Sequence, residues 1–535
     1  MNTPHFPVVV AGAGPVGSAV ATLLSDYGIE CLVLDRWESV YPQPRAVHLD
    51  DEVHRIVSRL GLADEFARIS RPGQGLRLVD RDMRVLAEFR RSTATGVHGF
   101  PQANMFDQPE FEQLLRSGLA RRDTVTFRGN VEITDVANTR EGSRVTFVDR
   151  ATGLREFVNA DYVLGCDGAN SIVRSSIGSR MDDMGFEQRW LVVDLATGRD
   201  LEHWEGVHQV CDPIRAATYM RIGETRYRWE FRLLPGESAE RYSTLNRLQP
   251  LLAPWIRDVD DSDFELVRVA DYTFRAQVAD RWRDRRVFLL GDAAHLTPPF
   301  IGQGMGAGLR DSANLAWKLA GVIGGTLPRT CLDSYETERK PHAASMIRLA
   351  VAVGWAMTEG GTFGNAVRRT LAPLAVRVPA LGSKIIEGVT PSLRASEFVH
   401  RDPVHVGLSG SLCPNAILDA DGRRLDDVAH DAFVVVTTID PTEEQRYEIE
   451  RRGAQVIRPA AESNLGRWLA GGRITAAIVR PDRTVLRAGR SLSRLYTHLP
   501  TFTPETDGGC RRPVTGERHR GPGSRAPRFG SGVQL

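Results

Sequence analysis

The 535-residue chain has almost no net charge and no long hydrophobic run. Lys and Arg total 68 against 67 for Asp and Glu, so no overall field attracts nucleic acid or an anionic membrane. The nearest approach to a membrane span, Ala343 to Met357, is too short and carries Arg348. A glycine-rich stretch begins at Val8 and leaves no room for a signal peptide. We expect a cytoplasmic globular protein without nucleic-acid or membrane partners.

Cysteine is also scarce, and its spacing argues against two kinds of site. The six cysteines include no C-x-x-C pair and stand far apart, at Cys31, Cys166, Cys211, Cys331, Cys413 and Cys510. No cluster of His, Cys or carboxylates has the spacing of metal ligands. We therefore expect free thiols in a reducing compartment, with neither a disulfide framework nor a metal site.

The most informative stretch is a buried apolar run that ends in three glycines. Residues 8–17 read VVVAGAGPVG, which places Gly12, Gly14 and Gly17 at the spacing G-x-G-x-x-G. This pattern predicts a strand, a tight turn that admits a pyrophosphate, and a helix whose N-terminus faces the phosphates. A second strand is predicted over 31–34, and Asp35 at its end can bind the hydroxyls of an adenosine ribose. The fingerprint leaves NAD, FAD and a ligand-free structural turn as alternatives.

Two more buried strands end in an acid and small residues. The first, over 162–166, leads into Asp167 and a short helix whose Arg174 is expected to reach back toward this acid. The second, over 286–290, leads into Asp292, a proline turn at 298–300, four glycines over 302–308 and a helix expected over 309–319. Glycines before a helix leave free amides and a positive helix end, which can lie against a flat ring and stabilise negative charge on it.

From about residue 185 to 279 the sequence alternates with period two and is rich in aromatic residues and arginine. In residues 226–233, Tyr227, Trp229 and Phe231 share one face and the charged residues share the other. This alternation predicts an antiparallel sheet with a buried aromatic side. The aromatic residues are expected in the core, and the alternative is that some of them line a cavity for an aromatic ligand.

A separate small α/β unit is predicted from about residue 407. Strands are expected over 433–438, 455–457 and 476–482, with a helix over 441–452. Beyond residue 503 the chain consists of Gly, Pro, Arg and Ser with few apolar residues, which predicts a disordered tail.

Taken together and in this order, the three glycine and aspartate signals resemble the class A FAD monooxygenases, the single-component flavoprotein aromatic hydroxylases. The resemblance spans most of residues 7–485. It is closest to members that act on 3-(3-hydroxyphenyl)propanoate or 3-hydroxycinnamate, as judged from residues 44–52, 211–213, 229–237 and 305–318. Asp35 stands where members commonly have Glu. The C-terminal unit is similar to the thioredoxin-like domain of some members, but Cys413 has no partner for redox chemistry.

This resemblance implies an α/β fold in which a Rossmann-like FAD-binding domain is interleaved with an antiparallel substrate sheet and followed by a thioredoxin-like domain. The expected ranges are 1–180 and 281–400 for the FAD-binding domain with a helical linker, 181–280 for the sheet, 401–500 for the C-terminal domain and 501–535 for the tail. The residues that it implies for FAD binding are Gly12, Gly14, Gly17, Asp35, Arg36, Arg45, Gln108, Val131, Asp167, Asp292, Pro299, Gly304 and Met305.

The resemblance also implies the chemistry, in which NADH or NADPH reduces FAD and a flavin C4a-hydroperoxide formed with O2 hydroxylates a phenol. The backbone at Pro298 would face this substrate. A phenol reacts faster as its proton leaves, and His208 and Tyr219 are the two candidate bases, although a structural role for each is the alternative.

Two arginines and one tryptophan are the candidates for substrate binding. Arg215 or Arg221 could bind a substrate carboxylate, and Trp229 could line the pocket.

Two other functions stay open: hydroxylation of a larger polyketide or antibiotic scaffold, and flavin binding without turnover. The sequence leaves the oligomeric state open, with a homodimer as one option.

Overall fold

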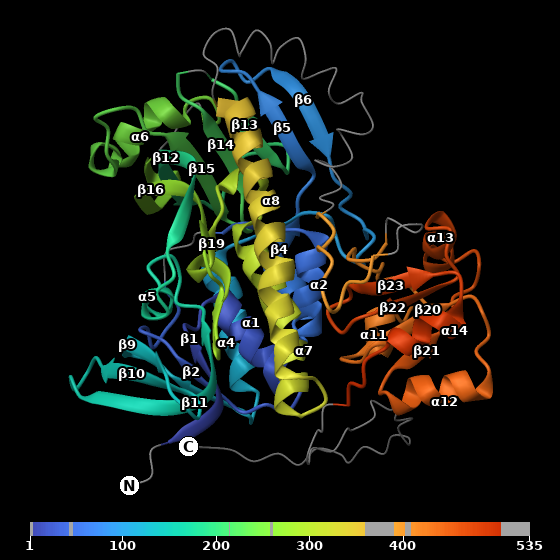
Figure 1. Cartoon of the computed structure of the whole chain (residues 1–535). Coiled ribbons are helices and arrows are strands. Elements are labelled where there is room, and N and C mark those ends of the chain that lie inside the picture. The colour runs from blue at the N-terminus through green and yellow to red at the C-terminus, as the bar shows by residue number, and fades with distance from the viewer. Residues whose placement is uncertain are drawn as a thin grey trace, which may run out of the picture. The chain divides into compact units, whose positions relative to one another are not determined.

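The computed structural model describes residues 4–41, 46–212, 214–256, 261–358, 390–401 and 408–503. All of them belong to one compact unit, Met1–Glu505. Figure 1 shows the arrangement of its helices and strands. Three sequence predictions fall outside the described residues, wholly or largely: the role of Arg45, the helical linker, and the disordered tail.

The first sheet is mixed and has eight strands. Its main path has the order β17-β18-β11-β1-β2-β8, and β10 joins β11 to β9. The strands β18, β11, β1, β2 and β8 run parallel, so their carboxyl ends share one edge. The bounds are β1 His5–Ala11, β2 Cys31–Leu34, β8 Val125–Arg128, β9 Val131–Asn138, β10 Ser143–Asp149, β11 Arg155–Gly165, β17 Arg283–Asp284 and β18 Val287–Leu289.

The glycine fingerprint forms the strand, turn and helix that its spacing predicts. Helix α1 spans Pro15–Asp26, with Gly14 as its N-cap and a proline in its first turn. Gly12 has φ +99°, and a Cβ there would lie 2.5 Å from the carbonyl oxygen of Cys166. A Cβ on Gly17 would lie 1.9 Å from the carbonyl oxygen of Gly12. Only glycine therefore permits this approach of α1 to β1 and β11.

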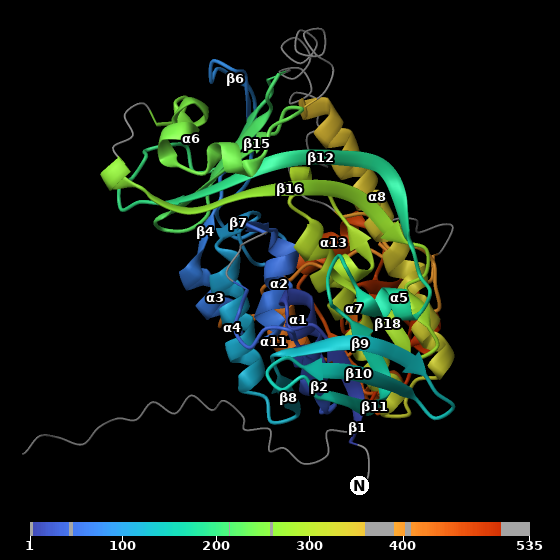
Figure 2. The same ribbon diagram turned by 90° about the vertical axis from the view of Figure 1, so that its left-hand side faces the viewer.

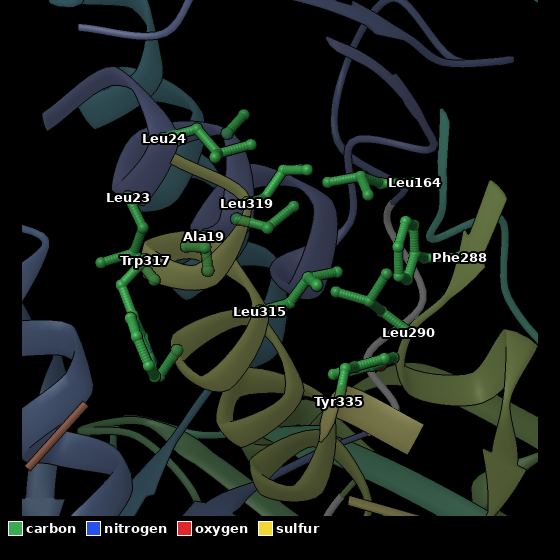
Figure 3. Packing of buried hydrophobic residues seen from close by; sticks show 14 of the residues in the cluster. Ala19, Leu23, Leu24, Leu164, Phe288, Leu290, Leu315, Trp317, Leu319 and Tyr335 are labelled. Atoms are coloured by element: carbon green, nitrogen blue, oxygen red, sulfur yellow. The ribbon is translucent and has the colours of Figure 1, made fainter. Parts of the chain in front are cut away.

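Helix α7, Gly304–Ile323, packs beside α1 in the main core. Figure 3 shows Leu315 and Leu319 of α7 among Ala19 and Leu23 of α1 and Phe288 of β18. Gly308 allows this contact, because a Cβ there would lie 2.5 Å from the Cγ2 of Val16 in α1 and 3.0 Å from the Cα of Gly291. The prediction that the helix begins at residue 309 is wrong: the glycines over 304–308 form its first turns and serve partly for helix packing.

The second sheet has eight strands in the order β19-β16-β12-β15-β14-β13-β5-β6 and is antiparallel apart from the β13–β5 pair. Figure 2 shows β12 and β16 as a pair of long, curved strands. The sheet also takes in β5 and β6, which lie outside 181–280. The bounds are β5 Gly75–Val79, β6 Val85–Arg90, β12 Met181–Ala196, β13 Val207–Val210, β14 Ala217–Arg221, β15 Arg226–Arg232, β16 Glu265–Ala279 and β19 His295–Leu296.

One face of this sheet forms its own hydrophobic core. Tyr227, Trp229 and Phe231 of β15 are buried there, as predicted, against Leu248 and Leu252 of helix α6, Leu245–Leu252. The residues between them, including Arg228 and Glu230, therefore point to the opposite face. They are buried as well, so this second face is covered rather than open to solvent.

The other described elements that precede the C-terminal part are helices and one small sheet. The largest is α8, Asp333–Thr358, which packs against α7 and β16. A small antiparallel sheet has the order β3-β7-β4. The bounds of these elements are β3 His48–Leu49, α2 Asp51–Arg59, α3 Ala63–Ile69, β4 Ser70–Pro72, β7 Asn104–Phe106, α4 Gln108–Ala120 and α5 Ile172–Ser176, with short 3-10 helices at η1 Ala239–Tyr242, η2 Asp261–Asp263, η3 Gly291–Ala293, η4 Pro299–Ile301 and η5 Arg329–Leu332.

The C-terminal part is the small α/β unit that the sequence predicts. Its four strands have the order β21-β20-β22-β23. A fully buried ion pair connects it to α8, because Arg480 donates to both carboxylate oxygens of Glu338 at 2.9 and 3.0 Å. The bounds are α11 Leu425–Ala429, β20 Val434–Thr437, α12 Glu443–Arg451, β21 Gln455–Ile457, α13 Asn464–Gly471, β22 Ala476–Val479, β23 Val485–Gly489, α14 Leu492–Leu495 and η6 Tyr496–His498.

Candidate functional site

A cavity of about 660 Å³ extends from the carboxyl edge of the first sheet to the covered face of the second. At one end it is lined by residues that directly follow β1, β2, β11 and β18. In open α/β sheets this edge is the usual place for ligands. The residues that line this end include Gly12, Gly14, Asp35, Arg36, Gln108, Val131, Asp167, Asp292, Pro299, Gly304 and Met305.

Asp35 stands at the end of β2 with its carboxylate fixed by backbone donors. It accepts hydrogen bonds from the amides of Ala13 at 2.6 Å and Trp37 at 2.7 Å. Arg116 lies 3.6 Å away. These contacts hold the acid beside the glycine turn, while its cavity side stays open to a ligand hydroxyl. The neighbouring Arg36 is more exposed and lies 3.8 Å from Glu132.

Two helix N-termini meet the cavity without a side-chain cap. Gly14, which has no side chain, is the N-cap of α1, and the side chain of Gln303, the N-cap of α7, does not bond to the first turn of its helix. The Gln303 amide donates instead to Asp50 at 2.8 Å. The first amides of both helices, which include those of Gly304 and Met305, are therefore available to a negatively charged ligand.

The segments that carry Asp167 and Asp292 are connected by the side chain of Arg174. Asp167 accepts from the Ser171 hydroxyl at 2.5 Å and from the amide of Val173 at 3.1 Å, and burial raises the pKa of this carboxyl group. Arg174 donates to the carbonyl oxygen of Ala293 at 3.0 Å rather than to Asp167. This bond joins the turn after β11 to the turn that carries Asp292.

Gln108 connects helix α4 to the segment that follows the undescribed residues 42–45. Its side-chain oxygen accepts from the amide of Ala46 at 2.5 Å, and its amide group donates to Glu112. Gln108 and Val131 both line the cavity, whereas Gly17 does not line it and acts through helix packing. The predicted cofactor residues thus gather around one end of one cavity, apart from Gly17 and the undescribed Arg45.

The other end of the cavity is formed by the polar face of the second sheet. Arg228 donates to both oxygens of Asp194, at 2.7 and 2.9 Å, and both side chains are 1% exposed. Glu230 lies two residues further along β15. Sequence analysis did not select these residues, although a charged pair in a strand flanked by buried aromatics is a signal for a covered polar site. The lining here includes Trp190, Val192, Gln209, Thr218, Met220, Arg228, Glu230, Arg268, Tyr272 and Phe274.

The predicted bases are on the other face of this sheet. His208 and Tyr219 pair across β13 and β14, and their rings lie 5.4 Å apart in the aromatic core with Trp229. None of the three lines the cavity. Burial lowers the pKa of His208 to about 4 and raises that of Tyr219. This placement favours a structural role for these residues, the alternative stated above.

The other predicted substrate residues are engaged elsewhere. Arg215 donates to Glu237 at 2.7 and 2.8 Å, and Arg221 donates to Glu205 at 2.9 Å. Neither arginine lines the cavity. Pro298 is buried just outside the lining, and the next residue, Pro299, is part of it.

His295 pairs with Asp311 of α7 at 2.9 Å, and both side chains are fully buried. The same Asp311 accepts from the amide of Gly291 at 3.0 Å. Within the described ranges, no group of three His, Cys, Asp or Glu residues could hold a metal ion. In the same part of the chain, every helix is too short or too polar to cross a membrane.

Comparison with known proteins identifies the family. Residues 5–350 match the family model described as an FAD binding domain. The chain belongs to this family. This FAD-binding protein is 33% identical over 511 residues to a "probable NADH-specific resorcinol 4-hydroxylase" of Rhodococcus jostii, covering 91% of this chain and 93% of that one. It is 36% identical over 441 residues to a 3-(3-hydroxy-phenyl)propionate/3-hydroxycinnamic acid hydroxylase of Burkholderia cenocepacia, covering 81% and 80%.

Solved structures share the fold of this FAD-binding family member. The flavin-dependent monooxygenase PieE, in complex with FAD and substrate, superposes with a TM-score of 0.77 at 22% identity, covering 92% of this chain and 98% of that one. Aklavinone-11 hydroxylase, with FAD and aklavinone, gives 0.76 at 22% identity, covering 94% and 99%. The protein is an FAD-dependent aromatic monooxygenase. The site fits FAD, because two uncapped helix ends, a fixed carboxylate and the open space beside Gly14 are present together.

Proposed function

We propose that this monooxygenase uses NADH and O2 to hydroxylate a meta-substituted phenol held against the polar face of the second sheet. One observation carries the proposal: a single cavity joins the carboxyl edge of the FAD-type sheet to that face. A cofactor at one end and a phenol at the other would share one enclosed space. The overall reaction balances as phenol, NADH, H⁺ and O2 giving a dihydroxybenzene, NAD⁺ and water.

Different residues of the site are proposed to bind different parts of FAD. Asp35 binds the adenosine ribose, and the amides after Gly12 and at the start of α1 bind the pyrophosphate. Asp292 binds the ribityl chain. The amides of Gly304 and Met305, at the positive end of α7, stabilise negative charge on the flavin ring. Bound FAD supplies the electron transfer and oxygen activation, while the protein positions and encloses the reactants.

The substrate class follows from what the two relatives' names have in common. Resorcinol and 3-(3-hydroxyphenyl)propionate are both phenols with a substituent at the meta position. We propose hydroxylation ortho to the phenolic hydroxyl. The NADH-specific name of the Rhodococcus relative supports NADH over NADPH as reductant.

Steady-state assays with product identification test this function. The purified protein is given NADH or NADPH with resorcinol, with 3-(3-hydroxyphenyl)propanoate, with a polycyclic phenol, or with 3-phenylpropanoate, which has no phenolic hydroxyl. We expect resorcinol or 3-(3-hydroxyphenyl)propanoate to stimulate NADH oxidation and to yield one equivalent of hydroxylated product per NADH. NADH oxidation without product for every phenol would support a flavin-binding protein without turnover. Activity only with a polycyclic phenol would support the larger-scaffold alternative.

The domain boundaries given above remain part of the proposal, with β5 and β6 added to the substrate domain. We also propose that the C-terminal unit is thioredoxin-like, because it has a four-stranded mixed sheet with helices beside it. Cys413 is buried, and burial raises the pKa of its thiol to about 12, which argues against redox activity. The homodimer, the cytoplasmic location and the absence of nucleic-acid and membrane partners stay predictions.

A further inference from the structure

Glu230 is a buried carboxylate that faces the substrate end of the cavity. It lies in the middle of β15, between Trp229 and Phe231, whose rings belong to the core on the other face. The residue is only 8% exposed, and it lines the cavity. On the same face its neighbours across the sheet are Thr218 and Val192, which also line the cavity. Glu230 thus presents its charge to the cavity rather than to bulk water.

Its carboxylate accepts no hydrogen bond from any residue that the structure describes, whereas comparable buried acids nearby are paired. Asp194 accepts two bonds from Arg228, and Glu237 accepts two from Arg215. Thr218 donates to Gln209 at 3.0 Å and not to Glu230. A buried carboxylate without a donor is destabilising, and the natural explanation is a ligand that brings the donor.

We propose that Glu230 is the group that accepts the hydrogen bond of the substrate's phenolic hydroxyl and takes its proton as the ring is oxygenated. This inference rests on the proposed function and names the base that it needs. The O–H bond of the phenol breaks, its electron pair moves toward the ring, and the proton forms a new O–H bond on the Glu230 carboxylate. The proton returns to water after the product leaves.

The electrostatic surroundings suit this role. Burial raises the pKa of Glu230, and three charged groups of the same sheet act on it. Arg228 of β15 and Arg268 of β16 oppose the rise, and Asp194 of β12 adds to it. A phenol titrates near pH 10, so a carboxyl group with a raised pKa is a closer match as a proton acceptor than an exposed glutamate. Glu230 must be ionised to accept, so activity should fall as the pH drops through its raised pKa.

Binding measurements on the FAD-loaded protein test the hydrogen bond without relying on turnover. The probes are 3-ethylphenol and ethylbenzene, which differ only in the hydroxyl group, and the flavin absorbance change reports the Kd. A hydrogen bond to a charged acceptor should make the wild-type protein prefer 3-ethylphenol by roughly 10- to 100-fold. Glu230→Gln should reduce this preference at least severalfold. Glu187→Gln, an exposed glutamate on β12 of the same sheet, is the control and should retain it.

The pH profile of kcat/KM tests the proton transfer. The wild type and Glu187→Gln should show an acid limb, which Glu230→Gln should lose together with roughly 100-fold in rate. Glu230→Asp, which keeps a carboxylate, should recover part of both. A Glu230→Gln protein with unchanged ligand preference and an intact acid limb overturns the inference. If the wild type prefers the phenol through Glu230 but hydroxylates no phenol, the proposed function fails and the assignment of the hydrogen-bond acceptor stands.

Discussion

Replacing the three fingerprint glycines by alanine, one at a time, should separate the fold from cofactor binding. Gly12 and Gly17 are in steric contact with backbone, whereas nothing lies within 4 Å of the Cβ position of Gly14. Gly14 also has φ −69°, which any residue adopts, and it lines the cavity. We expect Gly12→Ala and Gly17→Ala to destabilise the apoprotein, and Gly14→Ala to weaken FAD binding alone.

The contacts set the size of each effect. At Gly12 the backbone, with φ +99°, is strained for alanine by about 1–3 kcal/mol. Its Cβ, 2.5 Å from the Cys166 oxygen, adds an overpacking cost of about 1–3 kcal/mol. Gly17→Ala places a Cβ 1.9 Å from the Gly12 oxygen and should cost at least as much. Gly14→Ala should change stability by less than about 0.5 kcal/mol. Its methyl group would occupy space proposed for the pyrophosphate, and a loss of about 1.4 kcal/mol there raises the Kd tenfold.

Two measurements on each variant separate its effect on stability from its effect on FAD binding. Urea unfolding of the apoprotein gives the change in stability, and quenching of flavin fluorescence gives the Kd for FAD. The reasoning is refuted if Gly14→Ala destabilises the apoprotein as much as Gly12→Ala does, or if Gly14→Ala binds FAD as tightly as the wild type.

Three further outcomes follow from the second sheet. Asp194→Asn leaves the buried Arg228 without its counter-charge and should lower the free energy of unfolding by about 3–5 kcal/mol, measured in urea; a loss below 1 kcal/mol would contradict the pairing. Tyr219→Phe should keep kcat/KM within about twofold, because this ring is on the core face; a hundredfold loss would restore it as a candidate base. Hydrogen bonds from Arg215 lower the pKa of Glu237 from 4.5 to about 2, so its stabilising effect is complete above pH 4.5 and is lost as the pH falls toward 2. The stability difference between wild type and Glu237→Gln should therefore shrink over that interval, and a constant difference would exclude this linkage.

The cofactor end of the site was predictable because its signals are local. Gly12, Gly14 and Asp35 belong to one strand, turn and strand, and spacing along the chain alone places them at the carboxyl edge of a parallel sheet. Asp167 and Asp292 follow buried strands in the same way. The start of α7 was misplaced because glycine is usually unfavourable within a helix, and only the close approach to Gly291 and Val16 explains its presence there.

The substrate end could not be predicted in the same way. Period-two alternation establishes that β15 has two faces, and it placed Tyr227, Trp229 and Phe231 together on the buried one. Alternation does not reveal what covers each face, because that depends on elements distant in the chain. Here α6 covers the aromatic face, while the cofactor edge of the first sheet lies across the cavity from the face that carries Arg228 and Glu230. The sequence by itself thus determined the glycine fingerprint and the family resemblance, and only the tertiary structure decided which side of the second sheet faces the cavity.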